Sequence, residues 1–166
     1  MSRYVSYLRQ ADIFYELSPE QLESVASLCS ERRVHTGEVI FSEISGSDEL
    51  YVIAQGEVDI VVDPALVSDG RLAAPGPMTI ATLHRGQSFG EVALVDRGLR
   101  SASARASQGN TQLLVIPRDR LMELCDANPD LGYRLMRNLA ADLALKMRNT
   151  DLNIRQQSLD WTRRKG

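Results

Sequence analysis

Hydrophobic residues near the N-terminus of this chain follow a helical spacing. The apolar positions there are Leu22, Val25, Ala26 and Leu28. Most of them recur three or four residues apart, so they predict an amphipathic helix over residues 19–29. Ser18 and Gln21 have the spacing of a capping box, and Pro19 suits the first position of a helix. A shorter helix is expected at about residues 4–10.

The pattern changes to that of strands between about residues 33 and 117. Short runs rich in Val and Ile alternate there with turns that contain glycine. The runs cover residues 39–41, 50–53, 58–62, 78–81 and 113–116. This spacing predicts an all-β sandwich or barrel. Residues 63–77 hold three prolines and two glycines, which predicts a long connection between two strands.

Helical spacing returns after Pro117. One helix is expected over residues 118–128, because Pro129 disfavours helical geometry at the residue before it. A second helix is expected to start near Pro129 and to continue past Thr150. Its apolar residues form two stripes, since residues seven apart drift only about 20° around a helix. The stripes are Leu139, Leu143, Met147, Ile154 and Trp161 on one side, and Ala141, Leu145, Leu152 and Leu159 on the other.

A helix with two apolar sides needs two partners. The β-domain is one candidate, and the same helix of a second subunit is the other. Packing of both sides within one molecule is the alternative. The spacing alone leaves the choice open.

The composition excludes several classes of protein. The net charge of −3 excludes a generally basic protein that coats nucleic acid, and no direct nucleic-acid binding is expected. No apolar run approaches the roughly 18 residues that cross a membrane, and residues 1–6 lack the apolar stretch of a signal peptide. We therefore expect a cytoplasmic protein without membrane contact.

The cysteines and histidines argue against a metal site. Cys29 and Cys125 stand far apart without a CxxC pattern, and both fall in predicted helices, so buried free thiols are expected. A metal-dependent enzyme on a similar β-barrel, such as a cupin, needs several His and carboxylate ligands. The chain has only His35 and His84, which we expect at strand ends or on the surface. Neither a metal nor an enzymatic activity is predicted.

Residues 89–102 carry the chemistry that suits an anion. A short helix starting at Val92 would direct free backbone N–H groups outward, and Gly90 lets the backbone approach a ligand closely. Arg100 offers a permanently charged planar fork for phosphate oxygens. Glu91 can only accept hydrogen bonds, so it should face a hydroxyl group such as a ribose 2′-OH. A structural ion pair of Glu91 with Arg100 or Arg97 is the competing interpretation.

The run FGEVALVDRGLRSASARA, residues 89–106, resembles the phosphate-binding cassette of cyclic-nucleotide-binding domains. Such domains occur in the catabolite activator protein, in the regulatory subunit of cAMP-dependent protein kinase and in cyclic-nucleotide-gated channels. The resemblance extends over about residues 12–150. It includes Phe14 with Leu17 and Ser18, residues 36–41, 50–53 with 56–58, and 86–91. It implies a mainly β fold: a double-stranded β-helix (jelly-roll) barrel with N-terminal helices and a long C-terminal helix.

The resemblance also implies roles for single residues. Glu91 would accept the ribose 2′-OH, and Arg100 would pair with the cyclic phosphate. The remaining ligand-binding candidates in the cassette are Phe89, Gly90, Val92, Ala93 and Ser101. The last helix would contact the base, with Lys146, Met147 and Thr150 as candidates. The cassette departs from the family where many members have Pro and this chain has Leu99, and Asp96 and Arg97 make its turn more charged than usual.

The resemblance implies a sensor that binds cAMP, or alternatively cGMP, as a ligand and has no cofactor. Residues 1–150 would form the binding domain, and residues 151–166 a helical extension or tail. A homodimer through the C-terminal helix is expected, and the downstream effector is not specified by the sequence. A degenerate member that binds no nucleotide and serves in dimerisation or docking is the alternative function.

Overall fold

The structure is a computed structural model that describes residues 2–66 and 76–165. Its helical elements are α1 (Tyr4–Leu8), η1 (Asp12–Phe14), α2 (Pro19–Ala26), η2 (Pro64–Leu66), α3 (Val92–Val95), α4 (Arg118–Ala127) and α5 (Pro129–Lys165). Its strands are β1 (Ser30–Val34), β2 (Val39–Phe41), β3 (Glu49–Gln55), β4 (Glu57–Val62), β5 (Met78–His84), β6 (Ser88–Phe89), β7 (Ser103–Ala106) and β8 (Thr111–Pro117). The predicted mainly β jelly-roll fold with N-terminal helices and a long C-terminal helix is confirmed.

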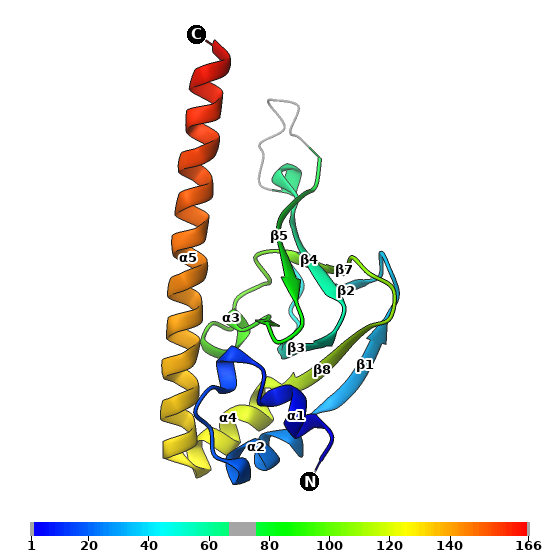
Figure 1. Cartoon of the computed structure of the whole chain (residues 1–166), viewed down its shortest axis with the longest axis vertical. Helices are drawn as coiled ribbons and strands as arrows, with labels where there is room; N and C mark the ends of the chain where they lie inside the picture. The colour runs from blue at the N-terminus through cyan, green and yellow to red at the C-terminus, as the bar shows by residue number, and fades with distance from the viewer. Residues whose placement is uncertain (1, 67–75, 166) are drawn as a thin grey trace.

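The strands pair into two antiparallel sheets. One has the order β1-β8-β3-β6 and the other β2-β7-β4-β5. Side chains from both sheets meet in a shared core, while α1, α2, α4 and the first part of α5 cover the outer face of β3 and β8 (Figure 1). Strand β3 is therefore buried on both faces. Its apolar run is continuous rather than alternating, as expected for a strand between two layers.

The predicted helices and strands are present with shifted ends, and strands β1, β6 and β7 are additional. Strand β1 was not predicted, because its sequence SERRV is polar and only Val34 is buried. Helix α2 ends at Ala26, three residues before the predicted end at Cys29. The capping box of Ser18 and Gln21 is present. Of the predicted connection 63–77, residues 67–75 lie outside the described part of the chain.

Both cysteines are free thiols, but only Cys125 lies in a helix. Cys29 follows α2 and is half-buried, because the chain turns there into β1. Burial raises the pKa of the Cys29 thiol to about 12 and also raises the pKa of Cys125. Within the described residues, no helix is both long enough and apolar enough to cross a membrane.

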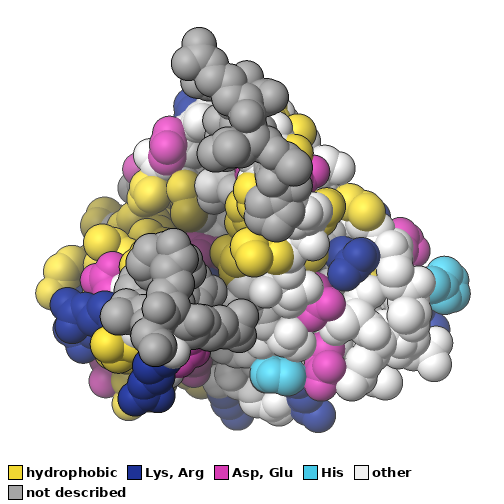
Figure 2. Space-filling view, turned by 90° about the horizontal axis from the view of Figure 1, so that it is seen from above, with side chains coloured by type: hydrophobic (Ala, Val, Ile, Leu, Met, Phe, Trp, Pro, Cys, Tyr) yellow, Lys and Arg dark blue, Asp and Glu magenta, His cyan; other side chains and the backbone are white. Residues whose placement is uncertain are grey.

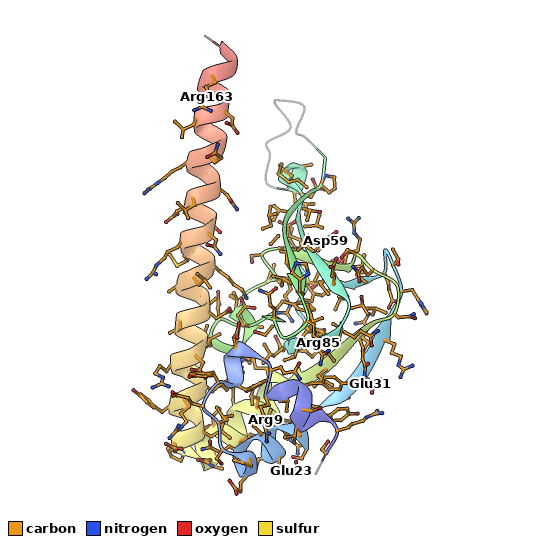
Figure 3. All side chains as sticks on the ribbon, in the orientation of Figure 1. Arg9, Glu23, Glu31, Asp59, Arg85 and Arg163 are labelled. Carbon is orange, nitrogen blue, oxygen red and sulfur yellow. The ribbon has the colours of Figure 1, made fainter. Side chains whose placement is uncertain are left out.

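Helix α5 changes its surroundings along its length. Its first four turns pack on the core through Leu131, Leu135, Leu139 and Leu143. Lys146 still contacts the β-domain, and beyond it the helix continues away from the other elements, with residues 147–156 exposed (Figures 1 and 3). The first predicted stripe therefore divides: Leu139 and Leu143 are packed, whereas Met147 and Ile154 are exposed. The side chain of Trp161 is outside the described part. The helix runs without a break through residue 150, where we predicted the domain to end.

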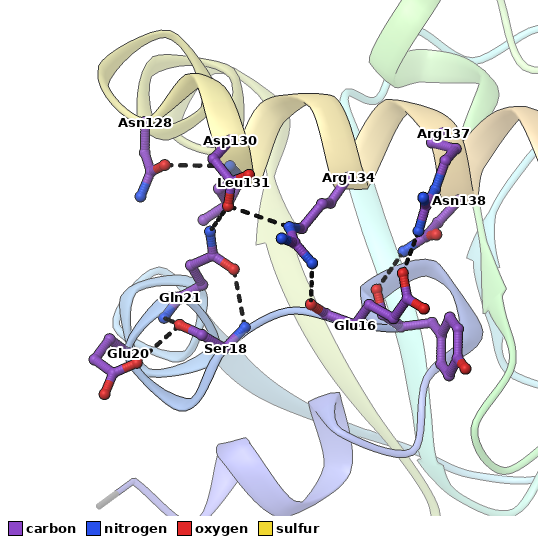
Figure 4. A network of polar contacts seen from close by, with 11 residues as sticks. Glu16, Ser18, Glu20, Gln21, Asn128, Asp130, Leu131, Arg134, Arg137 and Asn138 are labelled. Carbon is purple, nitrogen blue, oxygen red and sulfur yellow. Dashed lines mark hydrogen bonds and ion pairs between the residues drawn. The ribbon is translucent and has the colours of Figure 1, made fainter.

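A polar network fixes the start of α5 on the loop between η1 and α2 (Figure 4). Asn138 donates from Nδ2 to the carbonyl oxygens of Ile13, at 3.2 Å, and Tyr15, at 2.7 Å. Arg134 donates to the carbonyl of Glu16, and Arg137 forms an ion pair with its carboxylate. Glu16 has a positive φ of 62°, which is uncommon for a residue with a side chain. The network holds this loop and α5 as one unit.

Replacing Asn138 by Ala should lower the free energy of unfolding by about 1–3 kcal/mol, because two carbonyl groups lose their shared donor at a buried position. Chemical denaturation of the purified variants measures this difference. Asn149→Ala is the matched control, since Asn149 is exposed on the same helix. Equal losses in the two variants would show that the network does not stabilise the fold.

Candidate functional site

The segment between β6 and β7 forms a tight bend followed by one turn of helix, α3. Gly90 has φ +77°, a conformation that residues with a side chain rarely adopt. A Cβ atom at this position would lie 2.9 Å from Nη1 of Arg100 and 2.9 Å from the carbonyl oxygen of Glu49. The backbone of Gly90 thus packs directly against the guanidinium group. The amide of Ala93, predicted to face a ligand, donates to the Gly90 carbonyl at 3.2 Å.

Arg100 is buried at the end of this segment, with 7% of its surface exposed. Its Nε donates to Ser47 Oγ at 2.9 Å, Nη1 to the Gly90 carbonyl at 3.0 Å and Nη2 to the Glu49 carbonyl at 2.8 Å. All three acceptors are neutral. Within the described residues Arg100 forms no ion pair, so its positive charge is buried without a direct counter-ion.

A cluster of three aromatic residues packs next to Arg100. The guanidinium carbon lies 4.2 Å from the centroid of the Phe41 ring, a favourable cation–π distance. Phe41 contacts Tyr51 and Phe89, and these two rings stack at 5.0 Å. Burial lowers the pKa of Arg100. The guanidinium nevertheless stays charged at neutral pH, because arginine is not deprotonated in proteins.

Glu91, the other central residue of the cassette, is paired with helix α5. It is 6% exposed, and its Oε1 accepts a hydrogen bond from Lys146 Nζ at 2.9 Å. The ion pair that we considered for Glu91, with Arg100 or Arg97, is therefore replaced by one with Lys146. Burial acts to lower the pKa of Lys146, but the charge of Glu91 and the contacts with Asp142 outweigh it and raise this pKa.

The other predicted site residues divide between the core, the cassette surface and the helix. Phe89 is buried and directs its side chain into the core between the sheets. Val92 and Ser101 are exposed on the surface of the cassette. On α5, Met147 is 69% exposed, and Thr150 donates its hydroxyl to the Lys146 carbonyl at 2.9 Å. Of the three base-contact candidates, only Lys146 reaches the cassette.

Sequence reasoning missed the residues that hold Arg100 and Lys146 in place. Ser47 and Glu49 bind the guanidinium from a loop and strand distant in sequence, and Phe41 stacks on it. No local pattern indicates these contacts. Asp142 could have been found, because it stands four residues before Lys146 and opposite charges at this spacing meet on a helix.

The histidines occupy ordinary positions. His84 is the last residue of β5 and lies 3.2 Å from Glu57, and His35 directly follows β1. The prediction that they lie at strand ends is confirmed. Among the residues that the structure describes, no group of three or more His, Cys, Asp or Glu side chains could hold a metal ion.

Gly90→Ala should destabilise the protein more than Gly37→Ala. Both glycines have positive φ, so both variants lose about 1–2 kcal/mol to backbone strain. At Gly37 a Cβ atom meets nothing within 4 Å, whereas at Gly90 it displaces Arg100 or the backbone of Glu49. We expect a further loss of about 1–3 kcal/mol at Gly90, measured by chemical denaturation. Equal losses would mean that Arg100 does not pack tightly on this bend.

Comparisons with known proteins show the family of this chain. The family described as "Cyclic nucleotide-binding domain" matches residues 31–128. The cyclic AMP receptor protein of Thermus thermophilus is 31% identical over 94% of the chain, and the cGMP-dependent protein kinase, isozyme 1, of Drosophila melanogaster is 28% identical over 72%.

The chain spans 66% of the receptor protein and 15% of the kinase. The crystal structure of the Thermus thermophilus catabolite activator protein has 32% identity and a TM-score of 0.71, covering 89% of this chain and 63% of that one. A cyclic nucleotide-binding domain from Methylobacillus flagellatus has 25% identity and a TM-score of 0.77, covering 92% and 85%. The chain belongs to the cyclic nucleotide-binding domain family.

Proposed function

We propose that this chain is a sensor that binds a cyclic nucleotide, with the cyclic phosphate at Arg100 and the ribose 2′-OH at Glu91. The 31% sequence identity with a protein named cyclic AMP receptor protein favours cAMP as the ligand. Because a cGMP-dependent protein kinase is 28% identical, cGMP is the second ligand to test. The role is regulatory rather than catalytic.

The state of Arg100 is the observation that carries this proposal. Burying a charge is costly unless an opposite charge compensates it. Arg100 is buried against three neutral acceptors, one of which is the carbonyl of Gly90 that packs directly against the guanidinium group. A phosphate with one negative charge would supply the missing counter-ion and accept hydrogen bonds from the same fork.

A second candidate function rests on the same contacts. Arg100 already donates three hydrogen bonds to the protein, and Glu91 is already paired with Lys146. Such a satisfied network also fits a family member that keeps the fold, binds no nucleotide and serves in dimerisation or docking. Titration with nucleotide separates the two functions.

Helix α5 is the element that we propose reports occupancy. Its start is fixed by the contacts of Arg134 and Arg137 with Glu16. It contacts the cassette at Lys146 and leaves the domain beyond that residue. A sensor needs an element whose position differs between the free and bound states. A ligand that changes the cassette would act on α5 through the contact at Lys146.

We further propose that α5 pairs with α5 of a second copy. Leu145, Leu152 and Leu159 stand at seven-residue intervals and are each more than half exposed. Seen from above, hydrophobic side chains reach the surface at several places, interspersed with charged side chains (Figure 2). Two or three heptads make a weak coiled coil, so further contacts are needed. The exposed Met78 and Ile80 of β5 offer such contacts.

Arg100→Leu should weaken cyclic nucleotide binding by about 2–5 kcal/mol, because a buried phosphate loses its cation. Isothermal titration calorimetry with cAMP and cGMP measures the loss. Arg97→Leu is the matched control, since Arg97 is exposed on the same loop. Chemical denaturation of each variant checks the fold, because Arg100 also joins three segments. Unchanged affinity in a folded Arg100→Leu variant would remove the proposed role.

Changing both Leu145 and Leu152 to Lys should give monomers that still bind nucleotide. The change places charge between the paired α5 helices and leaves the cassette unaltered. Analytical ultracentrifugation at tens of micromolar measures the mass. The comparison variant changes Met147 and Ile154, on the other stripe, to Lys and should remain dimeric. A wild-type protein that is monomeric with and without cAMP would disprove the dimer.

A further inference from the structure

The ammonium group of Lys146 lies among three protein groups at the junction of α5 and the cassette. An ammonium has three N–H donors. Lys146 Nζ lies 2.9 Å from Glu91 Oε1, 3.1 Å from the Ser88 carbonyl oxygen and 2.8 Å from Asp142 Oδ2. Two of these contacts are hydrogen bonds, and the contact with Asp142 is an ion pair. The base contact that the resemblance implied for Lys146 would compete with these three contacts.

The contacts of Lys146 fix the shape of the bend that carries Glu91. Ser88 and Glu91 lie three residues apart, on either side of Gly90, and Lys146 joins them from a different element. Asp142 stands one turn earlier on α5 and holds the ammonium in place. The side chain of Glu91 therefore has one preferred direction, set by α5 rather than by the cassette alone.

Lys146 also compensates the charge of Glu91. The carboxylate is buried, and among the described residues Lys146 is the one cation within ion-pair distance of it. Lys146 binds Oε1, and within the same residues no hydrogen bond or ion pair to Oε2 is found. An ionised Glu91 can thus accept a hydroxyl hydrogen bond at Oε2 while Lys146 stays in place.

We infer that Lys146 is a positioning residue for ribose recognition: it pairs with Glu91 and orients it, so that the affinity for the 2′-OH depends on the docking of α5. This inference rests on the proposed function. It assigns Lys146 an action through Glu91 and not through the base. It also makes the coupling reciprocal, because a ligand that uses Glu91 favours the docked helix as much as the docked helix favours the ligand.

The test compares cAMP with 2′-deoxy-cAMP by calorimetry on the full chain. In the wild type, loss of a hydrogen bond to a charged acceptor should weaken binding of the deoxy ligand about tenfold or more. Lys146→Met should bring this ratio close to one, as Glu91→Gln should. The double variant should show no further fall, because both changes remove the same interaction. A ratio measured within one variant is insensitive to general damage to the fold.

Two controls sharpen the comparison. Lys146→Arg keeps the charge and should retain most of the ratio, and Arg148→Met removes an exposed charge from the same helix and should leave it unchanged. A Lys146→Met variant that binds cAMP with the wild-type ratio, or more tightly than the wild type, would overturn the inference and leave the proposed function standing. A wild-type chain that binds neither cAMP nor cGMP would overturn both.

Discussion

The candidate site depends on the positive charge of Arg100, which is buried and, among the described residues, forms no direct ion pair. Arg100 joins the β6–β7 segment to the loop before β3 and to β3 itself, through Ser47 and the carbonyls of Gly90 and Glu49. These dipoles and the Phe41 ring partly replace water around the guanidinium. They do not neutralise it, so the same contacts that stabilise the cassette leave it suited to an anion.

The two buried charged residues of the cassette are held from different elements of the fold. Arg100 is held from within the β-domain, whereas Glu91 is held from α5 by Lys146. Helix α5 is in turn fixed at its start by Asn138, Arg134 and Arg137 and is exposed beyond Met147. The start of α5 is anchored to the domain, its middle contacts the cassette at Lys146, and its later part is exposed. The helix therefore links the candidate site to a distant surface.

Much of this arrangement was accessible from the sequence, because it is recorded in local patterns. The capping box at Ser18, the strand runs, the Asn128–Pro129 helix boundary and the cassette itself are all short-range signals. Strand β1 was not predicted, because its contacts are ion pairs and backbone pairing with β8 and its sequence has no apolar alternation. The contacts of Arg100 with Ser47 and Glu49 and the Glu91–Lys146 pair were not predicted, because they join residues about fifty positions apart and no local spacing encodes such contacts.

A crystal structure of the chain grown with cAMP would test the central claim most directly. The account predicts that the cyclic phosphate lies within hydrogen-bonding distance of the Arg100 guanidinium and that the ribose 2′-OH donates to Glu91. A nucleotide bound elsewhere, with Arg100 still donating only to Ser47, Gly90 and Glu49, would contradict it.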